Sequence, residues 1–114
     1  MSSEPIDLPS ALERVGDDKG FLDSLLDMFT EDFIEKSGRL RKAVSGLDFG
    51  VVREIGHSLK GASSNLSLLP LQEACFQMER AGREQDIRLA EEALTMMDKE
   101  FGRLKEFLAS RNKG

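Results

Sequence analysis

The sequence lacks several features that would each point to a particular class of protein. Its single cysteine, Cys75, excludes an internal disulfide and suits a reducing compartment. No apolar run approaches the roughly 20 residues of a membrane span, and the N-terminus lacks the basic and apolar regions of a secretion signal. We therefore expect a cytoplasmic protein with no membrane partner.

Aromatic and basic residues are also scarce. The chain has no Trp or Tyr, and its 16 Lys and Arg residues are outnumbered by 21 Asp and Glu residues, which gives a formal net charge of −5. General binding of nucleic acid needs a basic stripe that replaces counterions, and stacking on bases needs aromatic rings. The composition therefore argues against a nucleic-acid partner.

The apolar residues that are present recur with a period near 3.6, and no segment shows the alternation of a strand. With Asp17 or Asp18, Asp48 and Asp86 as N-caps, this periodicity predicts helices at residues 9–15, 19–46, 49–66, 70–82 and 87–109. A length of 114 residues indicates one domain over residues 1–114, with flexible ends at 1–7 and 110–114. Because the connections are short, we expect an all-α, antiparallel up-down-up-down four-helix bundle with a short N-terminal covering helix.

The helix predicted at residues 49–66 has one apolar face and one wet face. The apolar positions fall within one sector of the helix: Val51, Ile55, Leu59, Ala62 and Leu66. His57, the only histidine of the chain, lies on the opposite side. Its neighbours on that side are Arg53, Lys60, Gly61 and Ser64.

A lone histidine on a wet helix face is most often merely solvated, so its neighbours decide the interpretation. The sequence argues against a metal site, because no second His and no nearby Cys completes a ligand set. A Ser-His-Asp hydrolase would need a pocket and an oxyanion hole, which a small bundle does not offer. An imidazole is a competent nucleophile near pH 7. Lys60, one turn after His57, can offer a cation to phosphoryl oxygens, and Gly61 removes a side chain that would obstruct a bulky phosphodonor.

The stretch from His57 to Leu66 reads His-Ser-Leu-Lys-Gly-Ala-Ser-Ser-Asn-Leu, and it resembles the phosphoacceptor helix of histidine-containing phosphotransfer (HPt) domains. The resemblance covers nearly the whole chain, including residues 6–17 and 21–29. It implies that His57 is the catalytic phosphoacceptor, that Lys60 stabilises phosphoryl charge and that Gly61 provides clearance. Gly56 departs from the family, in which alanine is more common before the histidine.

The resemblance also implies a phosphorelay intermediate of a two-component system. His57 would accept a phosphoryl group from a receiver-domain aspartyl phosphate and pass it to another receiver. The expected partners are response-regulator receiver domains or a hybrid sensor kinase, and the chain itself is expected to be a monomer. Mg²⁺ would be held by the partner receiver domain, so this chain needs no cofactor of its own. The sequence contains no glycine-rich phosphate loop or dinucleotide fingerprint that would indicate an ATP or kinase site.

Receiver docking is expected around His57. Arg53 and Ser64 flank it on the same helix, and the register of the helical hairpin sets Ile34 and Gly38 of the preceding helix at its level. Two alternatives stay open. The chain could be the phosphoacceptor domain of a chemotaxis-type histidine kinase, fed by ATP through a separate catalytic domain, or a non-catalytic helical adaptor in signalling.

Overall fold

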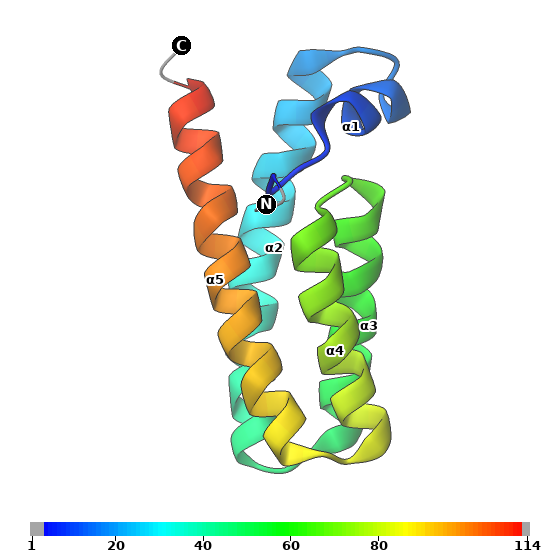
Figure 1. The fold of residues 1–114 in the computed structure, drawn as a ribbon, viewed down its shortest axis with the longest axis vertical. Coiled ribbons are helices and arrows are strands. Elements are labelled where there is room, and N and C mark those ends of the chain that lie inside the picture. The colour runs from blue at the N-terminus through cyan, green and yellow to red at the C-terminus, as the bar shows by residue number, and fades with distance from the viewer. Residues whose placement is uncertain (1–3, 113–114) are drawn as a thin grey trace.

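A computed structural model describes residues 4–112, which fold into five helices with no strand among them. The helices are α1 (Leu8–Arg14), α2 (Lys19–Ser45), α3 (Phe49–Asn65), α4 (Leu69–Glu84) and α5 (Ile87–Asn112). Helices α2 to α5 run alternately up and down as a bundle, and α1 lies across one end (Figure 1). The predicted all-α bundle with a short covering helix is thereby confirmed. None of these helices is both long and apolar enough to span a membrane.

Aspartate side chains fix the starts of the long helices. Asp18, Asp48 and Asp86 each accept a hydrogen bond from the backbone N–H three residues later, at 2.9, 3.3 and 3.0 Å. Each bond satisfies a donor that the first turn of a helix would otherwise leave unpaired. The caps predicted at Asp48 and Asp86 are therefore confirmed, and of the two candidates Asp17 and Asp18 it is Asp18 that caps α2.

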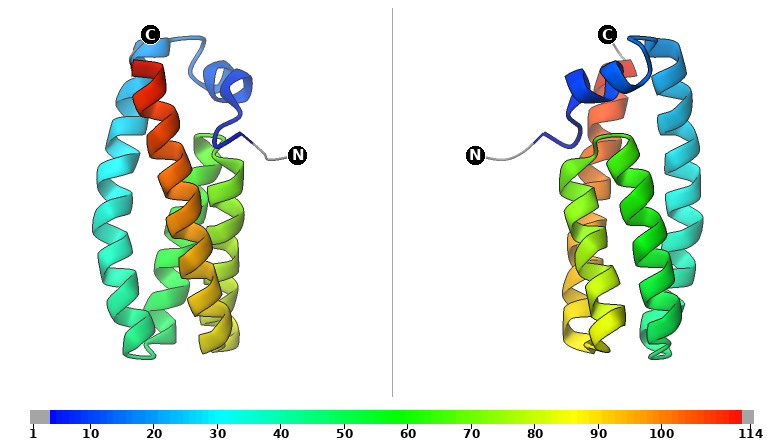
Figure 2. Two further views of the ribbon diagram at one scale, coloured as in Figure 1. Left: turned by 60° about the vertical axis from the view of Figure 1, so that its left-hand side comes forward. Right: turned by 90° about the vertical axis from the view of Figure 1, so that its right-hand side faces the viewer.

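Helices α3 and α4 lie side by side (Figure 2) and approach each other closely at two glycines. A Cβ atom added at Gly56 would lie 2.6 Å from the backbone nitrogen of Glu79, and one added at Gly82 would collide with the backbone of Arg53. Only a residue without a side chain fits either position. The predicted end of the fourth helix at Gly82 is therefore wrong, because α4 continues to Glu84 and Gly82 instead permits close packing.

The buried face of α3 is rotated toward α4 relative to the predicted face. Val51 and Ala62, both predicted to face the core, are half-buried, whereas Gly56 and Ser63 are buried. The difference arises because α4 covers the side of α3 on which Gly56 and Ser63 lie. His57, the next residue after Gly56, therefore stands at the edge of the α3–α4 interface.

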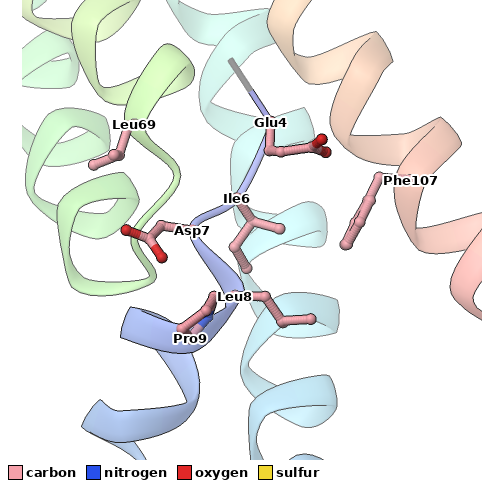
Figure 3. A pocket seen from close by; sticks show the side chains of 7 residues that line it. All are labelled: Glu4, Ile6, Asp7, Leu8, Pro9, Leu69 and Phe107. Atoms are coloured by element: carbon pink, nitrogen blue, oxygen red, sulfur yellow. The ribbon is translucent and has the colours of Figure 1, made fainter.

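Residues 4–7 form a strap across the end of the bundle. Ile6 is buried, and the backbone N–H of Asp7 donates to the carbonyl of Ser67 in the α3–α4 turn at 2.9 Å. Together with side chains of α4 and α5, the strap lines a largely apolar pocket of about 500 Å³ (Figure 3). Ile6 and Asp7 thus contact the bundle, residues 1–3 lie outside the described residues, and the flexibility of residues 1–7 stays a prediction.

The C-terminal end also differs from the prediction. Helix α5 continues to Asn112, and Nη1 of Arg111 lies 2.9 Å from Oδ1 of Asp23 on α2. This ion pair ties the last turn of α5 to the start of α2. Residues 110–112 thus belong to α5, residues 113–114 lie outside the described residues, and the flexibility of residues 110–114 stays a prediction.

Candidate functional site

His57 emerges at the edge of the α3–α4 interface, because the preceding residue is the glycine that meets α4. Its side chain is 69% exposed, which confirms the predicted solvent exposure. The ring is nevertheless anchored at one nitrogen, since Nδ1 lies 2.9 Å from Oε2 of Glu79 on α4. The site thus combines an accessible imidazole with a fixed orientation.

Glu79 is a buried carboxylate, 8% exposed, that contacts two side chains of α3. One oxygen contacts His57, and the other, Oε1, lies 2.6 Å from Nζ of Lys60. The ammonium of Lys60 also lies 5.8 Å from the centroid of the Phe76 ring. Lys60 is therefore placed one turn from His57 as predicted, but a carboxylate already engages its charge.

The electrostatics of this cluster determine which nitrogen of His57 carries the proton. The hydrogen bond from Lys60 is the largest cause of the lowered pKa of Glu79; burial opposes the shift, and the hydrogen bond from His57 adds to it. Glu79 is consequently ionised at neutral pH and can only accept hydrogen bonds. In a neutral imidazole the proton must then lie on Nδ1, so Nε2 keeps its lone pair. The geometry offers a nucleophilic nitrogen on an exposed ring.

A polar cavity of about 410 Å³ adjoins the ring on the side toward the start of α3. It is lined by Gly50, Arg53, Glu54, His57 and Glu79. Arg53, predicted to flank His57, is therefore brought to the same cavity. Within residues 4–112, no group of three His, Cys, Asp or Glu side chains lies close enough to hold a metal ion.

The opposite side of His57 faces α2. There, Nζ of Lys36 lies 2.9 Å from Oγ of Ser58 and 3.0 Å from Oδ2 of Asp32. Beside them, a Cβ atom added at Gly61 would have no heavy atom within 4 Å, so the space that the clearance role requires is present. Ser64, one turn further along α3, is half-buried.

Two predicted docking residues lie elsewhere. Ile34 and Gly38 are exposed as predicted, but they line a groove between α2 and α5 together with Asp98 and Phe101. Neither lines the cavity beside His57. The prediction that both lie near His57 is therefore corrected. The register of the α2–α3 hairpin predicts how far along α2 a residue lies, whereas Ile34 and Gly38 lie on the side of α2 that borders α5.

An apolar groove lies between α2 and α3. This α2–α3 groove has a volume of about 440 Å³ and is lined by Leu25, Met28, Phe29, Asp32, Ala62, Asn65 and Leu66. Met28 is 65% exposed, although it is a large apolar side chain. Asp32 connects the groove to the region of His57 through Lys36 and Ser58.

Sequence reasoning missed Glu79, which lies 22 residues after His57. One signal could have identified it, because Glu79 follows Cys75 by four residues and precedes Gly82 by three. It therefore shares the inner face of α4 with these two buried residues. A carboxylate in a buried helical phase needs a partner.

Comparisons with known proteins agree with this geometry. The family model described as "Hpt domain" matches residues 24–109. The chain is also similar to histidine-containing phosphotransfer protein B (HptB) from Pseudomonas aeruginosa PAO1, whose crystal structure superposes with a TM-score of 0.83. The two sequences are 27% identical, and the match covers 98% of this chain and 97% of that one. The comparison with curated proteins gave no match.

Replacing Glu79 by Gln keeps its shape and removes its charge. We expect the free energy of unfolding at pH 7 to fall by about 1–2 kcal/mol, because charge-assisted hydrogen bonds to His57 and Lys60 are weakened. The folded-state pKa of Glu79 lies below its ordinary value of 4.5. The stabilisation is therefore present above about pH 4.5 and is lost as the pH falls through the folded-state pKa.

Urea unfolding of wild type and Glu79→Gln between pH 3 and pH 7 tests this prediction. The difference between the two proteins should shrink as the solution becomes acidic. Glu92→Gln, which changes an exposed carboxylate on α5, is the matched control and should show no such difference. A Glu79→Gln difference that stays constant down to pH 3 would contradict the ionised carboxylate.

Proposed function

Because the chain belongs to the Hpt domain family, we propose that His57 accepts a phosphoryl group from the aspartyl phosphate of a receiver domain and passes it to a second receiver. Histidine phosphotransfer in two-component signalling is supported by this membership and by the likeness to HptB. Hpt domains interact with receiver domains and kinases. The observation that carries the proposal is the exposed imidazole of His57, held at Nδ1 by a buried carboxylate.

The transfer follows from the state of the ring. Nε2 attacks the phosphorus in line, an N–P bond forms, and the P–O bond to the receiver aspartate breaks with its electron pair leaving on the carboxylate. The ring then carries positive charge while Nδ1 keeps its proton. Because Glu79 Oε2 already lies 2.9 Å from Nδ1, this charge develops beside a fixed anion.

Lys60 and Gly61 serve the incoming group. The ammonium of Lys60 lies one turn from His57 and can move from Glu79 toward phosphoryl oxygens, whose charge it would stabilise. The open space at Gly61 admits the edge of the receiver's active site. We expect Mg²⁺ to be supplied by the carboxylates of the receiver, so that this chain contributes positioning and charge.

We place the receiver's docking contact at the α2–α3 groove. It is apolar, it contains the exposed Met28, and it adjoins Gly61 on the face of α3 shared by Ser58 and Ala62. A helix of the receiver seated there would bury these side chains and bring the adjoining aspartyl phosphate toward His57. Ile34 and Gly38 face α5 and have no part in this contact.

Transfer from a receiver domain that has been charged with radiolabelled phosphate tests the proposed relay. Wild-type protein should acquire an acid-labile label and lose it to a second receiver, whereas His57→Gln should acquire none. Because His57 is an exposed side chain, the variant should keep the helical circular dichroism of the wild type.

The rival functions give different results in the same experiment. An idle adaptor would acquire no label, and label that persists in His57→Gln would exclude His57 as the acceptor. A chemotaxis-type phosphoacceptor domain would be labelled by ATP and a separate catalytic domain but not by a charged receiver.

Docking at the α2–α3 groove is tested by Met28→Glu, which places a charge in the apolar contact. Transfer from the charged receiver should slow by about tenfold, the equivalent of about 1.4 kcal/mol of binding. Met96→Glu is the matched control, because Met96 is exposed on α5, away from the groove residues. Equal rates for the two variants, with unchanged melting temperatures, would place the contact elsewhere.

A further inference from the structure

The Glu79 carboxylate contacts the nitrogen that remains free when His57 is phosphorylated. In the described structure Oε2 of Glu79 lies 2.9 Å from Nδ1, and Glu79 is buried. Its backbone nitrogen packs directly against Gly56, the residue before His57, so the backbone that carries the carboxylate is held close to the histidine. Phosphorylation takes place at Nε2, so the carboxylate stays beside Nδ1.

The proton on Nδ1 controls how easily a phosphoryl group leaves Nε2. When the N–P bond breaks, its electron pair returns to Nε2, and the phosphoryl group is taken by a carboxylate or by water. With a proton on Nδ1 the ring leaves as neutral imidazole. Without this proton the ring must leave as an imidazolate anion, which is a far poorer leaving group.

We infer that Glu79 makes phosphorylated His57 a short-lived, ready phosphoryl donor at neutral and alkaline pH by keeping the proton on Nδ1 while the N–P bond breaks. This inference rests on the proposed phosphorylation of His57 and assigns Glu79 as a positioning residue for the release step. The lowered pKa of Glu79 agrees with this assignment, since the carboxylate stays ionised throughout the relevant pH range.

The other charges near the ring do not replace Glu79. Arg53 and Glu54 of α3 line the cavity beside His57, and the ammonium of Lys36 on α2 contacts the hydroxyl of Ser58 and the carboxylate of Asp32. Lys60 contacts the second oxygen of Glu79, so it moderates the negative charge without contacting Nδ1. Among residues 4–112, Glu79 is the carboxylate bonded to the ring.

The consequence is a protein that passes its phosphoryl group on and does not store it. A carboxylamide at this position would accept the same hydrogen bond but would bring no negative charge to favour the proton on Nδ1. Glu79 on α4 thereby determines how long His57 on the adjoining α3 stays phosphorylated.

The test measures loss of the phosphoryl group as a function of pH. Wild type, Glu79→Gln and Glu54→Gln are phosphorylated with potassium phosphoramidate, freed of the reagent, and followed by phosphorus NMR between pH 5.5 and pH 9. All three should lose phosphate at similar rates near pH 5.5, where solvent supplies the proton. Above pH 8 the Glu79→Gln protein should be at least fivefold slower than wild type, and Glu54→Gln should follow wild type.

Two outcomes would overturn the role of Glu79 in release. One is a pair of superimposed pH profiles for wild type and Glu79→Gln, and the other is an equal slowing at every pH, which is what a merely structural defect produces. Wild type should also retain its lability to higher pH than phosphorylated N-acetylhistidine, a comparison that needs no variant. If neither phosphoramidate nor a charged receiver forms an N–P bond on wild type, the proposed function fails as well.

Discussion

The ion pair and hydrogen bond of the buried Glu79 carboxylate hold the site together. Burying an ionised carboxylate costs several kcal/mol unless its oxygens are paired. Here one oxygen lies 2.9 Å from His57 Nδ1 and the other 2.6 Å from Lys60 Nζ. These two contacts offset the cost of burial, and at the same time they fix the tautomer of the histidine and hold the Lys60 ammonium beside the site in the resting protein. Local stability and the chemistry of phosphoryl transfer therefore depend on the same group.

The carboxylate reaches the ring because α3 and α4 approach each other closely at two glycines. Gly56 accepts the backbone of α4 at Glu79, and Gly82 accepts the backbone of α3 at Arg53. A methyl group at either position would separate the helices, and separation would lengthen the contact between Glu79 and His57. Gly56, which departs from the family's more common alanine, thus has a structural reason.

Much of the fold could be predicted from the sequence, because it depends on local signals. The caps at Asp18, Asp48 and Asp86 and the period of 3.6 place the helices to within a few residues, and the His57 stretch itself predicts an exposed acceptor. Such signals act over one or two turns, which is also the range over which sequence patterns can be interpreted. The resemblance of the chain to HPt domains then indicates the function.

The residues that were missed depend on how one helix faces another. Glu79 is 22 residues from His57, and only the rotation of α4 against α3 brings them together. In the same way, Ile34 and Gly38 line the groove between α2 and α5 and not the cavity beside His57, which depends on how α5 packs against α2. Helical periodicity predicts which face is buried and not which neighbour covers it.

The tautomer of His57 in the resting protein is the central claim about the site. Since the chain has a single histidine, a long-range proton–nitrogen correlation spectrum of the labelled protein near pH 8 reports this one ring without overlap. We expect a protonated Nδ1 and an unprotonated Nε2. A proton found on Nε2, or an even mixture of the two tautomers, would contradict the role of Glu79 in presenting Nε2 to the phosphodonor.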